Sequence, residues 1–337
     1  MELPTDKELK TREGCASYWA PAVICAAVLL TYLCRAAPQD SPHAAAPFPP
    51  RRPPPRAAPA GPSPSREVRL RTFDPQQADA LAARLDRLWK LARGAVPNVA
   101  PGAFPPDMGR LPVDQKKRVF LRSVLPHVLA ANRRVRRDRR RLLGIRKRLE
   151  RGEGLTEAER QALEVLAGRY RAGDAAARLI RDEPAALCDL LLERADEIPP
   201  SLALAQAAIE SAWGGSRFVR EGNSLFGQWV FSADKGIPPR ERPEGANYAV
   251  ASFDHLGHAV EAYARNLNTF WAYEPFRKLR ARMRARGEPL DPYRLAEGLW
   301  RYSERREAYV EEIRRVIRVN RLTRFDDVEL VEVKAAG

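Results

Sequence analysis

A single acidic residue lies within an otherwise uncharged, helix-forming stretch of the sequence. The segment AQAAIESAWGGS (205–216) contains Glu210 among small and apolar residues and ends just after Gly214 and Gly215. A carboxyl group in the last turn of a helix faces the negative end of the helix dipole, and apolar neighbours disfavour its ionised form. We therefore expect a raised pKa for Glu210.

A carboxyl group of this kind is suited to general acid catalysis. An acid that keeps its proton near neutral pH can give it to a departing oxygen, as glycoside hydrolysis requires. The alternative is a structural ion pair of Glu210 with Arg217 or Arg220, which forms easily in a chain with 58 basic residues. The residues by themselves support the two interpretations equally.

The helix that presents Glu210 is expected to begin at Ser201. Ser201 follows two prolines and is a good N-cap residue, and Leu202, Ala205 and Ile209 then recur on one face. Because the helix is rich in alanine, we expect it to pack closely against its neighbours near the centre of the domain.

Two strand-like runs follow this helix. The segments LFGQWVF and NYAVASF flank a connection rich in glycine, proline and charge, which predicts a β-hairpin within 225–253. Asp254 and Asp291 are predicted to cap the helices that come next.

The region 67–198 is predicted to be a mostly helical scaffold. Leu81, Leu85, Leu88 and Leu91 repeat at helical spacing, and a second such pattern at 119–128 is interrupted by Pro126. Thr156 and Glu159 form a capping-box pattern at the start of a later helix.

The first 66 residues indicate where the protein is located. Residues 16–34 are uncharged and about long enough to cross a bilayer as a helix, so we expect a cytoplasmic N-terminus (1–15), a transmembrane anchor (16–34) and a Pro/Ala-rich linker (35–66). A cleaved signal peptide is the competing interpretation, but the leading residues are not net basic. We expect the anchor to hold the remaining chain at the inner membrane. The flanking charges do not decide its orientation, because Arg35, Arg51, Arg52 and Arg56 follow the segment, so a periplasmic or cell-wall side for the downstream domain is expected only if its substrate lies there.

The composition favours an anionic partner. The chain has 337 residues, 45% of them hydrophobic, and a net charge of +15. Its most basic run, 132–152, has no interleaved aromatic residues and no nucleic-acid-binding motif, so we interpret it as a solvated helix face and expect no nucleic acid partner. The four cysteines and four histidines show no metal-binding spacing, and no cofactor or metal is predicted.

The sequence around Glu210 resembles that of a known family. The segments SLALAQAAIESAWGGSRF and GNSLFGQWVF are similar to the motif of peptidoglycan glucosaminidase domains, which are glycoside hydrolase family 73-like and mannosyl-glycoprotein endo-beta-N-acetylglucosaminidase-like. The segments GIPPRERPEGANYAVASF, LAEGLWRYSERREAYVEEIRRVIRVN and KKRVFLRSVLPHVLAANRRV resemble the Bax-like branch of that family. The resemblance covers roughly residues 110–322.

The resemblance implies an α+β, mainly α fold. The expected glucosaminidase domain (199–325) is lysozyme-like, with a helical lobe, a small β-hairpin lobe and a cleft between them, followed by a C-terminal tail (326–337). It implies catalytic roles for Glu210, as general acid, and for Tyr302. The implied substrate-binding residues are Asn223, Phe226, Gly227, Trp213, Trp229 and Tyr248, although core packing is the stronger interpretation for Phe226 and for both tryptophans.

A second catalytic group is not identified by the resemblance. The predicted hairpin offers Asp234, Glu241 and Glu244 as candidate carboxylates, and the family often has an acid after the tyrosine where this chain has Ala249. Assistance by the N-acetyl group of the substrate, positioned by Tyr302, is the alternative. We expect an endo-beta-N-acetylglucosaminidase that acts on peptidoglycan strands, with lytic transglycosylase chemistry or a degenerate wall-binding module as alternatives.

Overall fold

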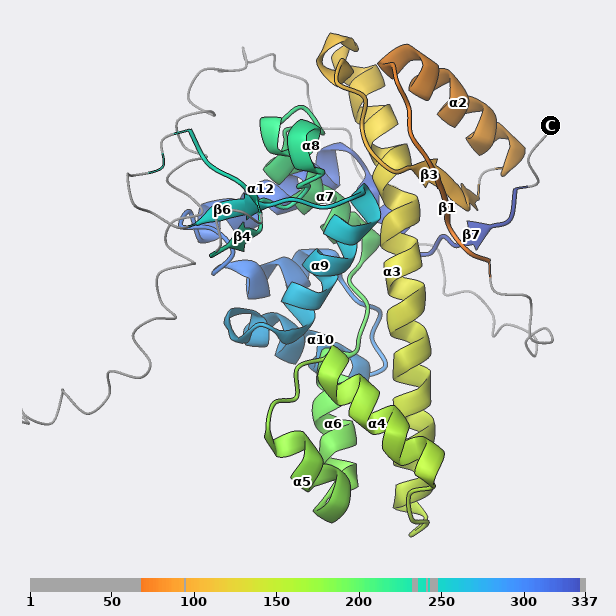
Figure 1. Ribbon diagram of the computed structural model, residues 1–337, viewed down its shortest axis with the longest axis vertical. Helices are drawn as coiled ribbons and strands as arrows, with labels where there is room; N and C mark the ends of the chain where they lie inside the picture. Colours follow the sequence, from red (N-terminus) through yellow and green to blue (C-terminus); the bar gives the residue numbers. More distant parts are fainter. Residues whose placement is uncertain (1–67, 94, 232–235, 241, 243–247, 334–337) are drawn as a thin grey trace, which may run out of the picture.

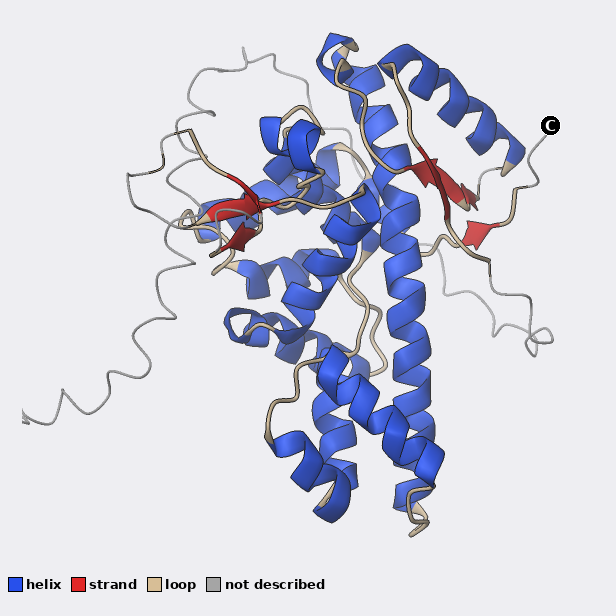
Figure 2. Ribbon diagram, in the orientation of Figure 1, coloured by secondary structure: helices blue, strands red, loops and turns tan. Residues whose placement is uncertain are grey.

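The computed structural model describes residues 68–93, 95–231, 236–240, 242 and 248–333. This part of the chain is mainly helical with small sheets (Figures 1 and 2), which confirms the predicted class in its coarse form. The helices are α2 (Ala78–Leu91), α3 (Val113–Glu150), α4 (Glu157–Arg169), α5 (Ala175–Asp182), α6 (Pro184–Arg194), α7 (Pro200–Ser211), α8 (Arg217–Gly222), α9 (Leu256–Thr269), α10 (Glu274–Ala285), α11 (Pro292–Leu295) and α12 (Glu307–Val319).

Helix α3 is the long element along which the other helices pack. It has 38 residues and packs against α6, α7 and α9 (Figure 1). It continues through Pro126, where the sequence pattern predicted an interruption. Proline removes one helical hydrogen bond, but the apolar stripe on both sides of Pro126, including Val124 and Val128, is fully packed. Tertiary packing therefore offsets the local cost.

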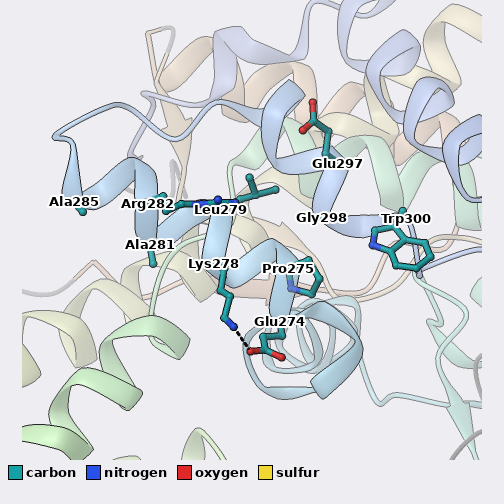
Figure 3. Close-up of a pocket in the computed structure, with 10 residues that line it drawn as sticks. All are labelled: Glu274, Pro275, Lys278, Leu279, Ala281, Arg282, Ala285, Glu297, Gly298 and Trp300. Atoms are coloured by element: carbon teal, nitrogen blue, oxygen red, sulfur yellow. Dashed lines mark ion pairs between the residues drawn. The ribbon is translucent and has the colours of Figure 1, made fainter. Parts of the chain in front are cut away.

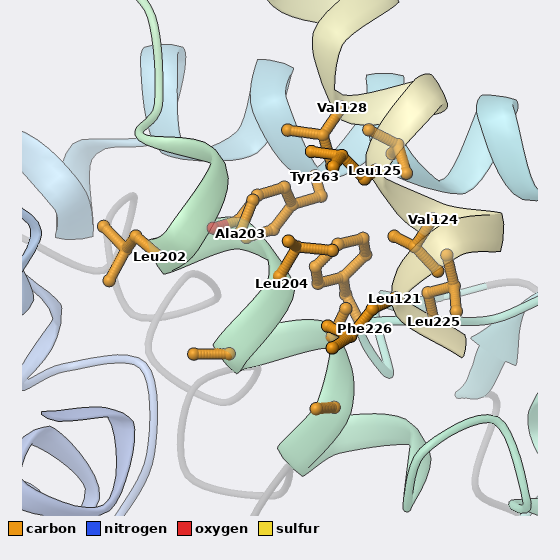
Figure 4. Packing of buried hydrophobic residues seen from close by; sticks show 14 of the residues in the cluster. Leu121, Val124, Leu125, Val128, Leu202, Ala203, Leu204, Leu225, Phe226 and Tyr263 are labelled. Atoms are coloured by element: carbon orange, nitrogen blue, oxygen red, sulfur yellow. The ribbon is translucent and has the colours of Figure 1, made fainter. Parts of the chain in front are cut away.

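Helix α7 lies at the centre of the main core, as its alanine content predicted. Residues 200–208 are all buried, and Leu204 points toward Leu125 and Val128 of α3, whereas Leu202 lies on the opposite side of α7 (Figure 4). Ser201 is not the N-cap, because the helix begins at Pro200. Instead, the Ser201 backbone N–H and hydroxyl each donate a 2.8 Å hydrogen bond to the carboxyl group of Asp326. A carboxyl group distant in sequence thus accepts a hydrogen bond from a backbone N–H group in the first turn of this helix.

The predicted hairpin is a three-stranded antiparallel sheet of short strands. The order is β4 (Trp229–Val230), β6 (Ala249–Ala251) and β5 (Gly236–Ile237), with Val250 of β6 between Trp229 and Ile237. A Cβ atom at Gly236 would lie 2.4 Å from the Val250 carbonyl oxygen, so the close approach of β5 to β6 requires glycine there.

Strands from both ends of the described chain pair beside α3. β1 (Arg71–Phe73) pairs with β3 (Val99–Pro101), and β2 (Val96–Pro97) pairs with β7 (Leu330–Val331), both in parallel. The Val333 N–H also donates a 3.0 Å hydrogen bond to the Asn98 side chain. The region 67–198 is therefore not helical throughout, and part of the segment predicted as a tail belongs to the packed structure.

The main hydrophobic core crosses the boundary that the sequence suggested at residue 198. It extends from Ala78 of α2 to Leu330 of β7 and includes α3, α7 and α9. A second, smaller cluster joins the C-terminal half of α3 to α4 and α6. The scaffold and the segment that carries Glu210 consequently share one core.

The basic run 132–152 lies within α3 and its C-terminus, and it bonds largely to the protein itself. Arg139 donates to the Leu192 carbonyl oxygen at 2.6 Å, and Arg148 pairs with Glu153 and Glu159 at 2.7 Å each. These contacts show that the run forms one face of a helix whose arginines pair with groups of the same protein. Within the described ranges, no helix combines the length and apolar character that a membrane span needs, and the predicted anchor at 16–34 lies outside them.

Candidate active site

Glu210 lies in the last turn of α7, as predicted, and is partly exposed. The helix ends in two consecutive left-handed residues, Ala212 (φ 50°) and Trp213 (φ 58°). The Trp213 N–H donates a 3.0 Å hydrogen bond to the Ala208 carbonyl oxygen and closes the helix. The chain turns away sharply and leaves the Glu210 carboxyl group at the edge of the core.

The partner of Glu210 is a phenol from a distant helix. The Tyr309 hydroxyl of α12 donates a 2.7 Å hydrogen bond to Oε1 of Glu210. Arg217 bonds instead to Glu221 and to the Pro238 carbonyl oxygen, and Arg220 bonds to the Gly215 carbonyl oxygen. Among the described side chains no cation lies within ion-pair distance of Glu210, so the proposed structural salt bridge is not formed with either arginine.

This environment raises the pKa of Glu210. Desolvation by burial is the largest cause and moves the pKa to about 7, while the Tyr309 hydrogen bond and the charge of Arg305 act in the opposite direction. The influence of Arg305 is limited because its guanidinium pairs with Glu312 at 2.6 Å. The predicted rise is confirmed, and its largest cause is burial among apolar neighbours, which is one of the two causes expected from the sequence.

The segment Phe226–Gly227 lies against the other side of the carboxyl group. Phe226 is buried and stacks on Tyr263 with ring centroids 3.9 Å apart. Gly227 has a left-handed φ of 58°, and a Cβ atom there would lie 4.0 Å from Oε2 of Glu210. Phe226 is therefore a core residue, whereas Gly227 brings bare backbone next to the acid.

Tyr302 packs on the ring of Tyr309 and is linked to Glu210 through that ring. Its ring stacks on Tyr309 with a centroid distance of 5.5 Å and an interplanar angle of 5°, and its hydroxyl donates a 3.3 Å hydrogen bond to the Phe226 carbonyl oxygen. Tyr302 thus joins α12 to the Phe226–Gly227 segment. The residue that contacts Glu210 directly is Tyr309, which the sequence reasoning did not single out.

Comparison with known proteins identifies the domain that carries this site. Residues 190–322 match the family model of mannosyl-glycoprotein endo-beta-N-acetylglucosaminidase, the glucosaminidase domain. The chain is 31% identical over 216 residues to Protein bax of Escherichia coli (strain K12), which covers 63% of this chain and 73% of that protein. The chain belongs to the Bax-like family of glucosaminidase-domain proteins. No solved structure matches it significantly.

Membership of the glucosaminidase family indicates a glycoside hydrolase with a carbohydrate substrate. The matched range contains α7 with Glu210, the three-stranded sheet, and α12 with Tyr309. It begins within α6 and ends after α12. In this glucosaminidase domain, the acid and its phenolic partner therefore come from near opposite ends of the matched range.

The remaining residues implied by the family resemblance lie at different depths. Asn223 is left-handed (φ 53°), and its amide donates to the Phe253 and Asp254 carbonyl oxygens at 3.0 and 3.3 Å. Trp229 is partly exposed and packs edge-on against Tyr248, with centroids 4.8 Å apart. Asn223 thus stabilises the approach to α9, whereas Trp229 and Tyr248 form an accessible aromatic pair on the sheet.

Trp213 is attached to the core of this glucosaminidase domain. Its ring packs edge-on against Phe120 of α3 at 5.6 Å, and the Lys117 ammonium lies 5.1 Å from the ring centroid. Trp213 is therefore partly exposed, like Trp229, but its ring packs against the core, so the structure supports a packing role without full burial.

The three candidate second carboxylates, Asp234, Glu241 and Glu244, lie outside the described residues. Within the described part, Glu312 is the acid whose charge acts on Glu210, and it is engaged with Arg305. No group of three or more metal-binding side chains occurs among the residues that the structure describes. The described site therefore consists of one protonatable acid and an aromatic, hydrogen-bonded surround.

Three further residues of this site escaped the sequence reasoning: Gln206, Tyr263 and Tyr309. Gln206 precedes Glu210 by four positions on α7, so helical geometry places both on one face. That spacing is the one local signal by which Gln206 could have been found. The two tyrosines reach the site only through the packing of α9 and α12.

Proposed function

We propose that this protein is a peptidoglycan hydrolase that cleaves the β-1,4 glycosidic bond after N-acetylglucosamine, with Glu210 as its general acid. The observation that carries the proposal is the placement of Glu210 at the edge of the core with a phenol, rather than a cation, as its partner. Its pKa of about 7 keeps a substantial fraction protonated at neutral pH. The glucosaminidase match supports the reaction class.

In the first step, the protonated Glu210 gives its proton to the glycosidic oxygen as the bond from that oxygen to C1 of N-acetylglucosamine breaks. The bonding electron pair stays with the departing oxygen, and C1 becomes electron-poor. Glu210 is left as a carboxylate, which the Tyr309 hydroxyl stabilises through its 2.7 Å hydrogen bond. The same carboxylate can later accept a proton from the incoming water and return to the acid form.

The reaction also needs a second catalytic group that assists the attack on C1, and two candidates can supply it. One is a carboxylate among Asp234, Glu241 and Glu244, and the other is attack of the N-acetyl oxygen of the substrate on C1. We favour the second candidate because, among the described residues, the one acid whose charge acts on Glu210 is Glu312, and Glu312 is paired with Arg305. Replacing Asp234, Glu241 and Glu244 singly by alanine should then leave turnover within about twofold of the wild type, whereas loss of activity in one variant would identify a protein base.

We further propose that residues 16–34 anchor the protein in the inner membrane with the glucosaminidase domain facing the cell wall. The net charge of +15 suits an anionic wall polymer through weak, salt-screened attraction. Protease treatment of intact spheroplasts tests this orientation. Digestion of the C-terminal domain from outside is expected, and protection of that domain until the membrane is opened would contradict the proposal.

The decisive experiment is digestion of purified peptidoglycan by the full-length protein, wild type beside Glu210→Gln, with the products identified by mass spectrometry. Reducing N-acetylglucosamine ends from the wild type alone would support the proposal. Anhydro products would indicate lytic transglycosylase chemistry instead. Binding to the wall without turnover by either protein would indicate a binding module.

A further inference from the structure

A buried chain of hydrogen bonds leads from the core to Glu210. The Tyr263 hydroxyl of α9 donates to Oε1 of Gln206 at 2.6 Å. The Gln206 amide nitrogen donates to the Tyr309 hydroxyl at 3.1 Å, and that hydroxyl donates to Oε1 of Glu210 at 2.7 Å. Tyr263, Gln206 and Tyr309 are each at most 1% exposed, so water does not compete for the two bonds that join these three residues.

The distances determine which way the Gln206 amide faces. A separation of 2.6 Å is typical of a hydroxyl donating to oxygen, and 3.1 Å is typical of an amide N–H donating to oxygen. A flipped amide would place nitrogen at the shorter distance, which is too short for an N–H donor. Gln206 therefore presents its oxygen to Tyr263 and its N–H group to Tyr309.

This orientation fixes the hydroxyl proton of Tyr309. Because the Tyr309 oxygen accepts from Gln206, its single proton is directed to Oε1 of Glu210. Oε1 is thereby an acceptor in both ionisation states of the acid. When Glu210 is protonated, this bond favours the proton on the other oxygen, Oε2, because the carbonyl oxygen of a carboxylic acid is a better acceptor than its hydroxyl oxygen.

We propose that Tyr263 and Gln206 are positioning residues that direct the acid proton of Glu210 to Oε2. The inference rests on the proposed function of Glu210 as general acid. Oε2 is the oxygen on the side of Gly227, which is partly exposed and has no side chain. We call the hydrogen-bonded chain Tyr263–Gln206–Tyr309 the relay. The relay keeps the transferable proton on Oε2, the oxygen that substrate can approach, and it keeps Oε1 bonded to Tyr309.

The relay also serves the product of proton transfer. Once Oε2 has given its proton to the glycosidic oxygen, the carboxylate keeps the Tyr309 hydrogen bond without any side-chain movement. If the Gln206 amide turned over, Tyr309 would donate to Gln206 instead. The acid proton could then bond from Oε1 to Tyr309, where it faces away from Gly227 and is not available for transfer.

The test uses the full-length protein with two substitutions, Tyr263→Phe and Gln206→Met. Tyr263→Phe removes one oxygen atom and lets the amide turn over, and Gln206→Met removes the link. Ser123→Ala is the matched control, because it also removes one buried hydrogen bond, from the Ser123 hydroxyl to the Val119 carbonyl oxygen, in a helix outside the relay. For each protein, kcat, KM and the pH profile are measured on peptidoglycan fragments, and the Glu210 carboxyl is titrated by ¹³C NMR.

Both relay variants are expected to lose about tenfold in kcat with unchanged KM. The NMR titration of Glu210 and the alkaline limb of the pH profile should both move to higher pH, because the carboxylate loses an oriented donor. Ser123→Ala should change neither. A purely structural role would lower thermal stability in all three variants without moving the titration.

Unchanged kcat and an unchanged Glu210 titration in Tyr263→Phe would overturn the inference, and this variant decides the matter if Gln206→Met does not fold. Failure of the proposed function is separately visible. In that case the wild type shows no turnover, while the NMR titration still reports whether the relay acts on Glu210.

Discussion

The Tyr309 hydroxyl lies 2.7 Å from Oε1 of Glu210, although 99 positions separate the two residues in the chain. The contact joins the N-terminal part of α12 to the C-terminal turn of α7. It gives a partly buried acid a neutral donor instead of a counter-ion, and burial then raises the pKa of Glu210 to about 7. This relationship determines how the site should respond to pH.

Activity should decline as the pH rises through about 7. In the proposed mechanism the acid form of Glu210 is the active form, and its fraction falls tenfold for each pH unit above the pKa. Initial rates on peptidoglycan fragments between pH 5 and 9 measure this limb. A rate that stays constant up to pH 9 would exclude Glu210 as the titrating acid.

Glu210→Gln should make the protein more stable at alkaline pH. The folded-state pKa of Glu210 is raised, so the native protein holds a proton that the unfolded chain releases, and wild-type stability is lost as the pH rises from about 4.5 through about 7. Glutamine cannot ionise and can still accept from Tyr309. Urea unfolding should show equal stability at pH 4 and a variant more stable by about 1–2 kcal/mol at pH 8, and a gain of the same size at both pH values would contradict the explanation.

Gly227→Ala should damage the active site beyond its cost to the backbone. Alanine at φ 58° costs about 1 kcal/mol of stability, and its methyl group would contact Oε2 of Glu210 at about 4.0 Å and displace water from it. Gly287→Ala is the control, since Gly287 has a similar φ of 65° and nothing within 4 Å of the added atom. We expect similar losses of stability in both variants, but a severalfold loss of kcat in Gly227→Ala alone.

Asp326→Ala should destabilise the start of α7. It removes both 2.8 Å hydrogen bonds to Ser201 and leaves a buried N–H without a partner, at a cost of about 1–3 kcal/mol. Asp327→Ala, one position further along and exposed, is the control. Burial raises the pKa of Asp326 to about 6, so the stability that this carboxyl contributes is lost as the pH rises through 6. The deficit of Asp326→Ala should accordingly be larger at pH 5 than at pH 8.

The two tryptophans near the site should respond differently to truncation. Trp229→Ala removes a partly exposed ring of the Trp229–Tyr248 pair, so KM should rise severalfold with little change in melting temperature. Trp213→Ala removes a ring packed on Phe120 and should lower stability by about 2–4 kcal/mol. Isothermal titration with chitin oligosaccharides and thermal unfolding distinguish the two effects. Equal binding by wild type and Trp229→Ala would remove Trp229 from the substrate site.

Features that depend on neighbouring residues were predictable from the sequence. The capping box of Thr156 and Glu159 is formed as the pattern predicted, and Asp291 caps α11 through the Tyr293 and Arg294 N–H groups. The cap before α9 was one residue off, because His255 rather than Asp254 accepts the hydrogen bond from the His258 N–H group. Such interactions span at most four residues, so local sequence contains nearly all the information that specifies them.

The sequence by itself determined the helical character of most of the residues that the structure describes and the place of Glu210 in the last turn of an alanine-rich helix. Only the tertiary structure decided the partner of Glu210, the cap that Asp326 supplies to α7, and the continuation of α3 through Pro126. Helix periodicity and caps arise from contacts within one or two turns. A hydrogen bond across 99 residues instead depends on how whole helices pack, and no local pattern encodes which buried hydroxyl will meet which buried acid.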